Sequence, residues 1–180
     1  MDTRCSYEEA RQRAQKIKLL IFDVDGVMTD GSIYLDNNGN EIKSFYVRDG
    51  HGIKMAQKAG LSVAIITGRE SQVVERRAKE LAIRELYQGI KDKAGIYRNL
   101  LSRYHCQDEE IAFMGDDIVD LPVMIRVGLP AAPADADELV IKHALFVSQK
   151  KGGRGAVREF IEFILKSNER WDSLIKDYCA

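Results

Sequence analysis

Two aspartates separated by one residue, Asp23 and Asp25, directly follow the apolar segment Leu19–Phe22. The segment is too short for a helix and is typical of a strand buried on both faces of a parallel sheet. The two-residue period of a strand predicts that both carboxylates lie on one side of the sheet edge where α/β proteins bind ligands. Carboxylates this close repel each other unless a proton or a cation intervenes, and Mg²⁺ meets that need. A surface turn is the alternative interpretation, because Asp-Gly pairs are common in turns.

Three further polar residues lie where predicted strands end or a predicted helix begins: Thr67, Lys93 and Asp116. A hydroxyl and backbone N–H groups at the start of a helix bind phosphate oxygens. A lysine supplies positive charge to the same oxygens, and another carboxylate adds a hard oxygen ligand for Mg²⁺. Each residue alone is equally compatible with a turn, an exposed helix position or a loop, so the assignment depends on their combination.

Together these residue types satisfy the requirements of phosphoryl transfer. Asp23 is the predicted nucleophile, since a carboxylate can carry a phosphoryl group as an acyl phosphate and divide hydrolysis into two steps. Asp25 is the predicted general acid for the leaving alcohol and general base for the attacking water. Thr67 and Lys93 are predicted to hold the phosphate. Asp116, with Asp117 and Asp120 behind it, is predicted to complete a Mg²⁺ site.

Strand-like and helical segments alternate along the chain, which predicts βαβ units and a parallel sheet flanked by helices in an α/β fold. The predicted strands are 19–22, 61–66, 83–87, 111–114, 129–132 and 145–147; the predicted helices are 7–18, 53–59, 71–81, 92–104, 121–127 and 137–143, with a last helix after residue 155. All 180 residues are assigned to one domain, with a C-terminal tail over about 166–180.

An Asn-Gly pair within residues 37–40, between two β-prone segments, predicts a β-hairpin over about 32–47, inserted after the first strand and above the site. An isolated hairpin is only marginally stable in water. The apolar residues Ile33, Leu35, Phe45 and Val47 are therefore expected to pack against another surface, for which a second copy of the chain is a good candidate.

Composition excludes several classes of partner. With 27 basic and 28 acidic residues and a pI near 6.3, the chain has no overall positive charge to attract nucleic acid or an anionic membrane. The chain shows neither a signal peptide nor an apolar segment long enough to span a bilayer. Cys5, Cys106 and Cys179 lack metal-ligand spacing and an even count, which favours a reduced, cytoplasmic protein.

The strand-end motifs, in this order, resemble the four motifs of the haloacid dehalogenase superfamily, whose fold is Rossmann-like. Further motifs narrow the resemblance: Asp23-Val-Asp-Gly-Val-Met-Thr-Asp-Gly31, Val47-Arg-Asp-Gly50, Thr67-Gly-Arg69, Tyr87-Gln-Gly89, Gly115-Asp-Asp117 and Gly152-Gly-Arg-Gly-Ala-Val-Arg-Glu159. With the Asn-Gly hairpin, this combination resembles the 3-deoxy-D-manno-octulosonate 8-phosphate phosphatase family from about Lys16 to Leu165.

The resemblance implies a Mg²⁺-dependent phosphatase without a cap domain, homotetrameric through its hairpins and acting in the lipopolysaccharide pathway of Gram-negative bacteria. It assigns the metal ligands to Asp23, the backbone carbonyl of Asp25, and Asp116. Lys91 competes with Lys93 for the phosphate role, and the four-residue offset from Gly89 favours Lys93.

The implied substrate is a small acidic sugar phosphate that carries a carboxylate besides its phosphate. Its predicted contacts, besides Asp25 and Lys93, are Val47, Arg48, Asp49, Gly50, Lys54, Arg69, Arg77 and Arg154. An exposed basic face is the alternative interpretation, and it is favoured for Lys54 and Arg77. Because three glycines flank Arg154, this segment is predicted to be mobile and to close over bound substrate.

Three other functions compete with this prediction. A related nonulosonate 9-phosphate phosphatase would share the catalytic residues, and only Arg48 argues against it, by resemblance. A receiver domain would carry its phospho-acceptor on the third strand, whereas the acids here follow strands one and four of the predicted order. A non-catalytic oligomerisation module would be expected to lack motif residues that this chain retains.

Overall fold

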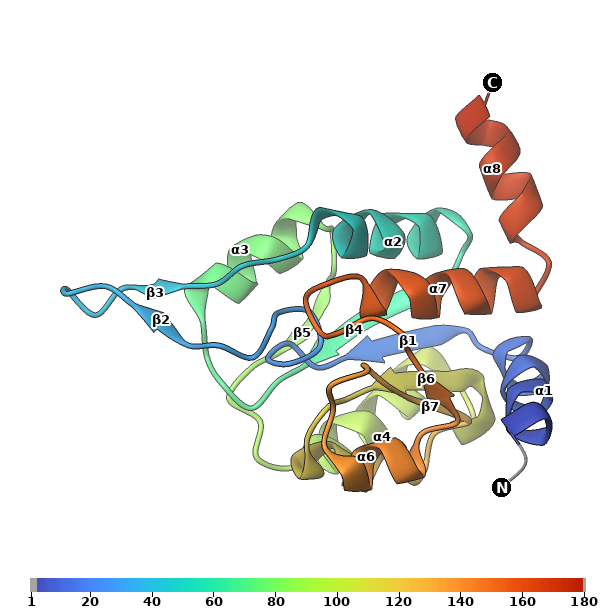
Figure 1. The fold of residues 1–180 in the computed structure, drawn as a ribbon, viewed down its shortest axis with the longest axis horizontal. Helices are drawn as coiled ribbons and strands as arrows, with labels where there is room; N and C mark the ends of the chain where they lie inside the picture. Colours follow the sequence, from blue (N-terminus) through green and yellow to red (C-terminus); the bar gives the residue numbers. More distant parts are fainter. Residues whose placement is uncertain (1–2, 180) are drawn as a thin grey trace.

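Six parallel strands form one sheet in the order β5-β4-β1-β6-β7-β8 (Figure 1). The computed structural model describes residues 3–179, with side chains from Tyr7 onward. The strands are β1 (Leu19–Phe22), β4 (Ser62–Ile66), β5 (Glu85–Tyr87), β6 (Ile111–Met114), β7 (Leu129–Ala132) and β8 (Phe146–Val147). Phe22, the last residue of β1, pairs with Ile65 of β4 and Met114 of β6. The carboxyl ends of these three strands therefore lie side by side.

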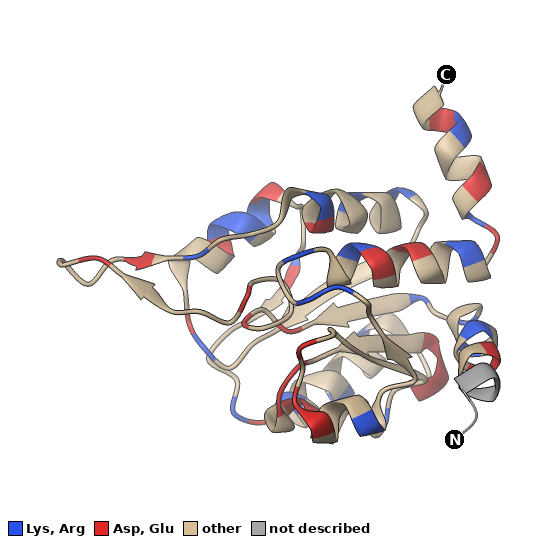
Figure 2. Cartoon of the chain, in the orientation of Figure 1, with Lys and Arg blue, Asp and Glu red and all other residues tan. Residues whose placement is uncertain are grey.

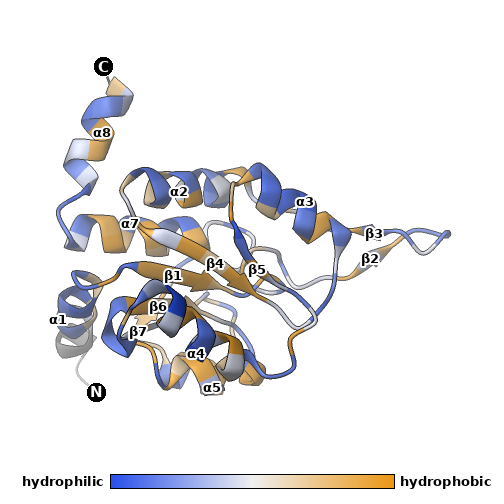
Figure 3. Cartoon of the chain, turned by 180° about the vertical axis from the view of Figure 1, so that it is seen from behind, coloured by the Kyte–Doolittle hydropathy of each residue, from blue (hydrophilic) through white to orange (hydrophobic). Residues whose placement is uncertain are grey.

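Alternate residues of the central strand point into two apolar layers. Leu20 and Phe22 belong to one buried cluster, and Leu19 and Ile21 belong to the other. The first layer is covered by α1 (Thr3–Ala14), α2 (Val47–Lys58), α3 (Gln72–Glu80) and α7 (Ala156–Ser167); the second by α4 (Lys93–Tyr104), α5 (Leu121–Met124) and α6 (Glu138–His143). Figure 3 shows the apolar strands enclosed between amphipathic helices. Both faces of the sheet are covered, as parallel sheets require.

The α/β prediction is confirmed, and the strands 19–22, 111–114 and 129–132 have the predicted bounds. Three predicted helices have wrong boundaries: α1 is Thr3–Ala14 rather than 7–18, α5 ends at Met124 rather than 127, and the start of α2 differs most. The second helix was predicted to begin at Ile53, after a glycine-containing turn, but α2 begins at Val47. Gly50 and Gly52 lie within this helix, where close packing against side chains of α3 and α7 leaves no room for a Cβ atom at Gly50 and little at Gly52.

The hairpin forms a separate two-stranded sheet from β2 (Tyr34–Leu35) and β3 (Glu41–Ile42), and it projects from the end of the molecule where β1 terminates (Figure 1). At its tip, one carboxylate oxygen of Asp36 accepts from the backbone N–H groups of Asn38 and Asn40, both at 2.8 Å. These bonds close the turn. The paired region is therefore much shorter than the predicted range 32–47.

The apolar residues of the hairpin divide into two groups. Ile33, Leu35 and Ile42 are 56%, 64% and 58% exposed. Phe45 instead packs against the core layer shared with α2 and α7, and Val47 already belongs to α2. Its own chain thus covers part of Phe45, and packing of this residue against a second copy stays a prediction.

The C-terminal part contains two helices rather than one. The predicted apolar stripe on α7 is confirmed, because Phe160, Ile161, Ile164 and Leu165 are all buried. A further helix, α8 (Trp171–Cys179), was not predicted. With α1, it lies at the end of the molecule opposite the hairpin (Figure 1). Among the described residues, no helix is both long and apolar enough to cross a bilayer.

Candidate active site

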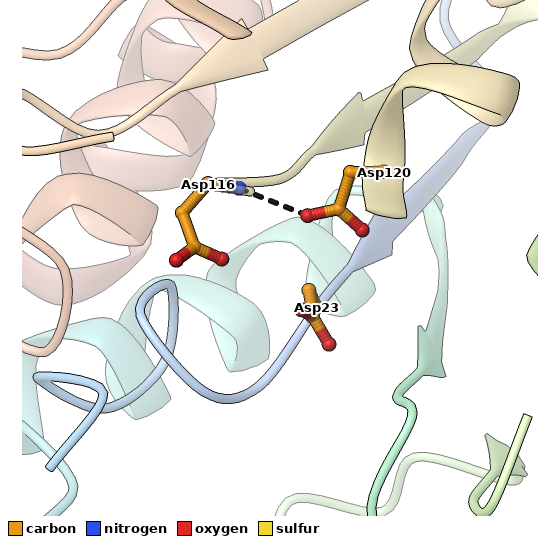
Figure 4. Close-up of side chains that lie close together, drawn as sticks. All are labelled: Asp23, Asp116 and Asp120. Atoms are coloured by element: carbon orange, nitrogen blue, oxygen red, sulfur yellow. Dashed lines mark hydrogen bonds between the residues drawn. The ribbon is translucent and has the colours of Figure 1, made fainter. Parts of the chain in front are cut away.

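Three aspartates converge where β1 and β6 end. Asp23 follows β1 directly, whereas Asp116 and Asp120 lie in the segment after β6 (Figure 4). Because β1 and β6 are neighbours in the sheet, their carboxyl ends bring these segments together. Each side chain offers one carboxylate oxygen, and the three oxygens lie within 4.8 Å of one another.

Two glycines permit this close approach. Gly26 has φ of +85°, and a Cβ atom there would lie 1.9 Å from Oδ2 of Asp116. A Cβ atom on Gly115 would lie 2.5 Å from the side chain of Asp120. Real Cβ atoms do not approach other atoms so closely, so any side chain at either position would displace a carboxylate.

Lys93, the first residue of α4, lies 4% exposed between two of the acids. Its Nζ is 3.1 Å from Oδ2 of Asp23 and 2.6 Å from Oδ1 of Asp120. Lys91, the competing candidate, is exposed on the surface. The geometry therefore favours Lys93 for the phosphate role, and Asp120 holds its ammonium group in place.

Asp120 is fully buried and has a second task. Its Oδ2 accepts from the backbone N–H groups of Asp116 at 3.0 Å and Asp117 at 3.3 Å, and Figure 4 shows the first of these bonds. The sequence pattern predicts Asp120 only behind the metal site and does not predict its bond to Lys93. The short helical turn Ile118–Asp120 produces that geometry, and the sequence carries no separate signal for it.

The electrostatics of the cluster favour a bound cation. Burial, reinforced by the charge of Asp120, raises the pKa of Asp23 to about 6, although Lys93 opposes this shift. Burial and the neighbouring carboxylates raise the pKa of Asp116 to about 8. For Lys93, burial favours loss of the proton, but the charges of Asp23 and Asp120 outweigh it and raise the pKa. Protons therefore bind readily where a metal ion would otherwise neutralise the acids.

The donor atoms fit a hard divalent cation. Oδ1 of Asp23 and Oδ1 of Asp116 are buried and have no hydrogen-bond partner among the described residues. A buried carboxylate oxygen without a partner is costly, and a metal ion removes that cost. Carboxylate oxygens are the ligands that Mg²⁺ prefers. The site thus fits Mg²⁺ on its own geometry.

Asp25 has a different environment. Its carboxylate forms an ion pair with Lys43 of the hairpin, and its Oδ2 lies 3.7 Å from Nε of Arg69. Because β1 ends at Phe22 and the chain turns after it, the two-residue period of a strand does not extend to Asp25. The carboxylates of Asp23 and Asp25 therefore have separate partners: Lys93 of α4 for Asp23, and Lys43 of the hairpin with Arg69 after β4 for Asp25.

Thr67 follows β4 directly and is only 2% exposed. Its backbone N–H donates to the carbonyl of Tyr87 at 2.9 Å, and its carbonyl accepts from Ile90 at 3.1 Å. These two bonds fix the residue at the same sheet edge as Asp23. Because β4 pairs directly with β1, the predicted phosphate-binding hydroxyl and the predicted nucleophile share one edge of the sheet.

The chain is similar in sequence to known hydrolases and phosphatases. A model of haloacid dehalogenase-like hydrolases matches residues 83–161. A 3-deoxy-D-manno-octulosonate 8-phosphate phosphatase of Yersinia pestis is 50% identical over 91% of this chain and 87% of its own length. The chain belongs to the 3-deoxy-D-manno-octulosonate 8-phosphate phosphatase family. The family prediction is therefore confirmed, as is the prediction of a phosphatase of the haloacid dehalogenase superfamily.

Solved structures of phosphatases agree with the fold. The Yersinia pestis enzyme superimposes with a TM-score of 0.90, at 49% identity, over 92% of this chain and 89% of that chain. The enzyme from Moraxella catarrhalis, solved in complex with magnesium, phosphate and the sugar acid KDO, has a TM-score of 0.93 at 38% identity, over 95% and 98% of the two chains.

The predicted substrate contacts of this phosphatase fall into two groups. Among the described residues, the side chains of Arg48, Lys54 and Arg154 form no hydrogen bond or ion pair. Val47, next to Arg48 in sequence, is also exposed. Arg69 is shared between Asp25 and the hairpin. Figure 2 shows basic residues along α3 and in the segment that leads into α7. Local positive charge thus exists in a chain whose net charge is −1.

Asp49, Gly50 and Arg77 have structural contacts. Asp49 is 2% exposed, and its carboxylate accepts from the backbone N–H groups of Gly155 at 3.2 Å and Arg158 at 2.8 Å, so it caps α7. Burial raises the pKa of Asp49 to about 6. Nη2 of Arg77 lies where a Cβ atom on Gly50 would be, and its guanidinium group lies 5.7 Å from the ring of Phe45. Their contact with substrate stays a prediction.

The segment Gly152–Gly155 is held by backbone contacts. Gly153 N–H donates to the carbonyl of Val27 at 2.9 Å, and Gly152 N–H donates to Oδ1 of Asp135 at 2.9 Å. A Cβ atom on Gly152 would lie 1.7 Å from the carbonyl oxygen of Gly26. The lack of a side chain at Gly152 and Gly153 thus allows this segment to pack closely against the segment after β1. The sequence pattern instead suggested that these glycines make the segment mobile. Arg154 between them and α7 is exposed.

Proposed function

We propose that this protein hydrolyses 3-deoxy-D-manno-octulosonate 8-phosphate to the free sugar acid and inorganic phosphate, with Mg²⁺ as cofactor. One observation carries the proposal: at a sheet edge beside Asp116, Asp23 has one oxygen paired with Lys93 and a second, buried oxygen without a hydrogen-bond partner in the described part of the chain. The 50% identity to a phosphatase named for this substrate supports it.

Asp23 acts as the nucleophile. Its carboxylate oxygen forms a bond to phosphorus, the bond between phosphorus and the sugar oxygen breaks, and Asp25 gives a proton to that oxygen. Water then attacks the aspartyl phosphate. Asp25 takes the proton of this water, the bond between phosphorus and Asp23 breaks, and phosphate leaves. Lys93 and Thr67 hold the phosphate oxygens during both steps.

The metal ligands are Asp23, the backbone carbonyl of Asp25, and Asp116. When bound, Mg²⁺ neutralises the negative charge of these acids and of the phosphate. Asp120 serves by fixing Lys93 and the backbone N–H group of Asp116, as its hydrogen bonds indicate. The magnesium and phosphate bound by the Moraxella catarrhalis enzyme support this assignment.

The substrate carboxylate binds cationic side chains that are free to receive it. Arg48, Lys54 and Arg154 meet this condition, and Arg69 can approach from its contact with the hairpin. A guanidinium group binds a carboxylate through two parallel hydrogen bonds. Val47, Asp49, Gly50 and Arg77 belong to the same predicted region, where they shape the binding surface around Arg48.

The proposal has three further parts. The protein forms a homotetramer through its hairpins, it is located in the cytoplasm, and it acts in lipopolysaccharide synthesis. The exposed apolar side chains of Ile33, Leu35 and Ile42 support assembly, because a marginal hairpin needs an apolar partner. Cys106 and Cys179 are both free thiols, which suits a reducing compartment.

A phosphate-release assay tests the substrate. Purified protein with Mg²⁺ should release phosphate from 3-deoxy-D-manno-octulosonate 8-phosphate with a higher kcat/KM than from a nonulosonate 9-phosphate or a neutral hexose phosphate. Asp23→Asn protein serves as the matched control for contaminating phosphatases. A preference for the nine-carbon substrate would favour the related phosphatase instead, and no release from any sugar phosphate would contradict the catalytic proposal.

A further inference from the structure

Lys43 is a buried cation on an otherwise exposed hairpin. It lies one residue beyond β3, and its side chain is only 2% exposed, whereas the neighbouring Ile42 is 58% exposed. The Lys43 ammonium group donates to Oδ1 of Asp25 and lies 3.4 Å from Oε1 of Glu41. The long, charged side chain of Lys43 therefore points from the hairpin toward Asp25, the residue proposed as general acid and base.

Glu41 holds this lysine from the opposite side. Its Oε1 also accepts from Arg69 at 3.0 Å, and its Oε2 accepts from the hydroxyl of Ser71, the N-cap residue of α3. The Ser71 hydrogen bond, together with the cations Lys43 and Arg69, keeps the pKa of Glu41 below its usual range despite partial burial. Asp25, Lys43 and Glu41 thus form a continuous chain of charges that ends on a fixed helix terminus.

The arrangement places strong constraints on Asp25. One carboxylate oxygen, Oδ1, is hydrogen-bonded to Lys43, whereas within the described part of the chain Oδ2 has only the longer approach of 3.7 Å from Arg69. A charge-assisted hydrogen bond to a buried partner fixes a carboxylate far better than contact with water does. Side chains in a catalytic site require such support to stay in the productive geometry.

We infer that Lys43 is a positioning residue for Asp25, holding Oδ1 so that Oδ2 is presented to the leaving oxygen of the substrate. This inference rests on the proposed function only in that Asp25 exchanges protons with the leaving oxygen and with water. Lys43 does not touch the reacting atoms in this scheme. Glu41 supports it by fixing the ammonium group between two carboxylates.

The scheme makes the effect of Lys43 depend on the leaving group. A sugar alkoxide is a poor leaving group and needs the proton from Asp25, whereas p-nitrophenolate departs as a stable anion. The value of kcat/KM includes phosphorylation of Asp23 and departure of the leaving group, so it reports this difference. A lysine that only stabilised the fold or bound phosphate would affect both substrates equally.

The test compares kcat/KM of wild-type, Lys43→Met and Glu41→Gln proteins on an alkyl phosphate and on p-nitrophenyl phosphate. General acid–base catalysis contributes about 10²- to 10⁴-fold, so we expect Lys43→Met to lose roughly 10- to 100-fold on the alkyl substrate and less than about threefold on the aryl substrate. Glu41→Gln should show the same pattern with a smaller loss. Lys79→Met, which removes an exposed lysine of α3, is the matched control.

Equal losses on the two substrates, or no loss on either, would overturn the inference. If Lys43→Met does not fold, as judged by circular dichroism, the Glu41→Gln ratio decides in its place. A double variant with Asp25→Asn adds a second criterion: Lys43→Met should cause little further loss on the alkyl substrate when Asp25 is already neutralised. Any alkyl phosphate that the wild-type protein hydrolyses is suitable, so failure of the proposed sugar specificity would be seen separately.

Discussion

The aspartate cluster at the sheet edge and the hairpin use charged residues in opposite ways. Asp23 and Asp116 lie within two residues of the ends of paired strands, whose register fixes their spacing, and the short helical turn Ile118–Asp120 adds Asp120. The hairpin has only two paired residues in each strand, and its charges Glu41 and Lys43 depend on contacts with distant parts of the chain. The sheet thus creates a site by itself, whereas the hairpin must be anchored to contribute to one.

The strongest test of the cluster is Asp23→Asn. An amide keeps the volume of the carboxylate but does not attack phosphorus, so turnover should fall by roughly 10⁴- to 10⁶-fold, as for other nucleophile substitutions. The circular dichroism spectrum and the melting temperature should stay close to those of the wild type. Substantial phosphate release from the folded variant would contradict the nucleophile assignment.

Removal of the metal should abolish activity and reveal the charge repulsion in the cluster. In the metal-free protein the pKa values of Asp23 (about 6) and Asp116 (about 8) exceed the ordinary value of 3.8. The folded state then binds more protons than the unfolded state, so this contribution to stability is complete below about pH 4 and is lost as pH rises through 6 and 8.

Mg²⁺ should offset that loss. We expect the increase in melting temperature on adding Mg²⁺ to chelator-treated protein to be larger at pH 8.5 than at pH 6, and activity to return with it. Differential scanning fluorimetry at both pH values measures this. In Asp116→Asn protein the difference should shrink. Full activity in chelator, or an equal shift at both pH values, would show that the acids do not form the metal site.

Two hairpin variants separate assembly from folding. Ile33→Asp places a charge on an exposed side chain, so it should leave the melting of the monomer unchanged while breaking an interface repeated by symmetry. Phe45→Asp places a charge against the chain's own core and should lower the free energy of unfolding by several kcal/mol. Light scattering and urea denaturation distinguish these effects. An unchanged molar mass for Ile33→Asp would refute assembly through the hairpin.

The smallest effect is expected for Arg154→Ala. Removal of one exposed guanidinium group should lower kcat/KM for the acidic sugar phosphate by roughly tenfold, since one charge-assisted contact is worth about 1.5–3 kcal/mol before solvent screening. A generic ester such as p-nitrophenyl phosphate should be hydrolysed almost as before. Steady-state kinetics on both substrates provide the test, and equal effects on the two would exclude a role for Arg154 in substrate selection.

The position of the candidate site was largely predictable from local patterns, because the polar residues that follow short apolar segments mark where those strands end. The predicted bounds of β1 and β6 placed Asp23 and Asp116 correctly at one sheet edge. The bond between Lys93 and Asp120 was not predictable, since it joins residues 27 positions apart through a turn that has no strong sequence signal. The alternation of Glu41, Ile42 and Lys43 did carry a signal for two faces of the hairpin, which sequence analysis did not use.

Glycines caused the clearest errors. Gly50 and Gly52 favoured a turn, yet both lie in α2, where the side chains of Arg77 and Arg158 approach the helix backbone. Gly152 favoured a mobile segment, yet it packs against the backbone of Gly26. A glycine in a sequence can indicate either a flexible backbone or a position with no room for a side chain, and only its neighbours in the folded structure distinguish the two.

The alternation of inward-facing and outward-facing side chains over residues 41–43 also limits where residues can be inserted into or deleted from the hairpin. Glu41 and Lys43 face the catalytic side, and Ile42 between them faces outward. A one-residue insertion or deletion beside Ile42 would exchange these faces and turn an apolar side chain toward Asp25, without altering any catalytic residue. Insertions at the tip, within 37–40, would leave the register between Asp25 and Lys43 unchanged. The loop tip is therefore the position at which a tag or a reporter can be placed.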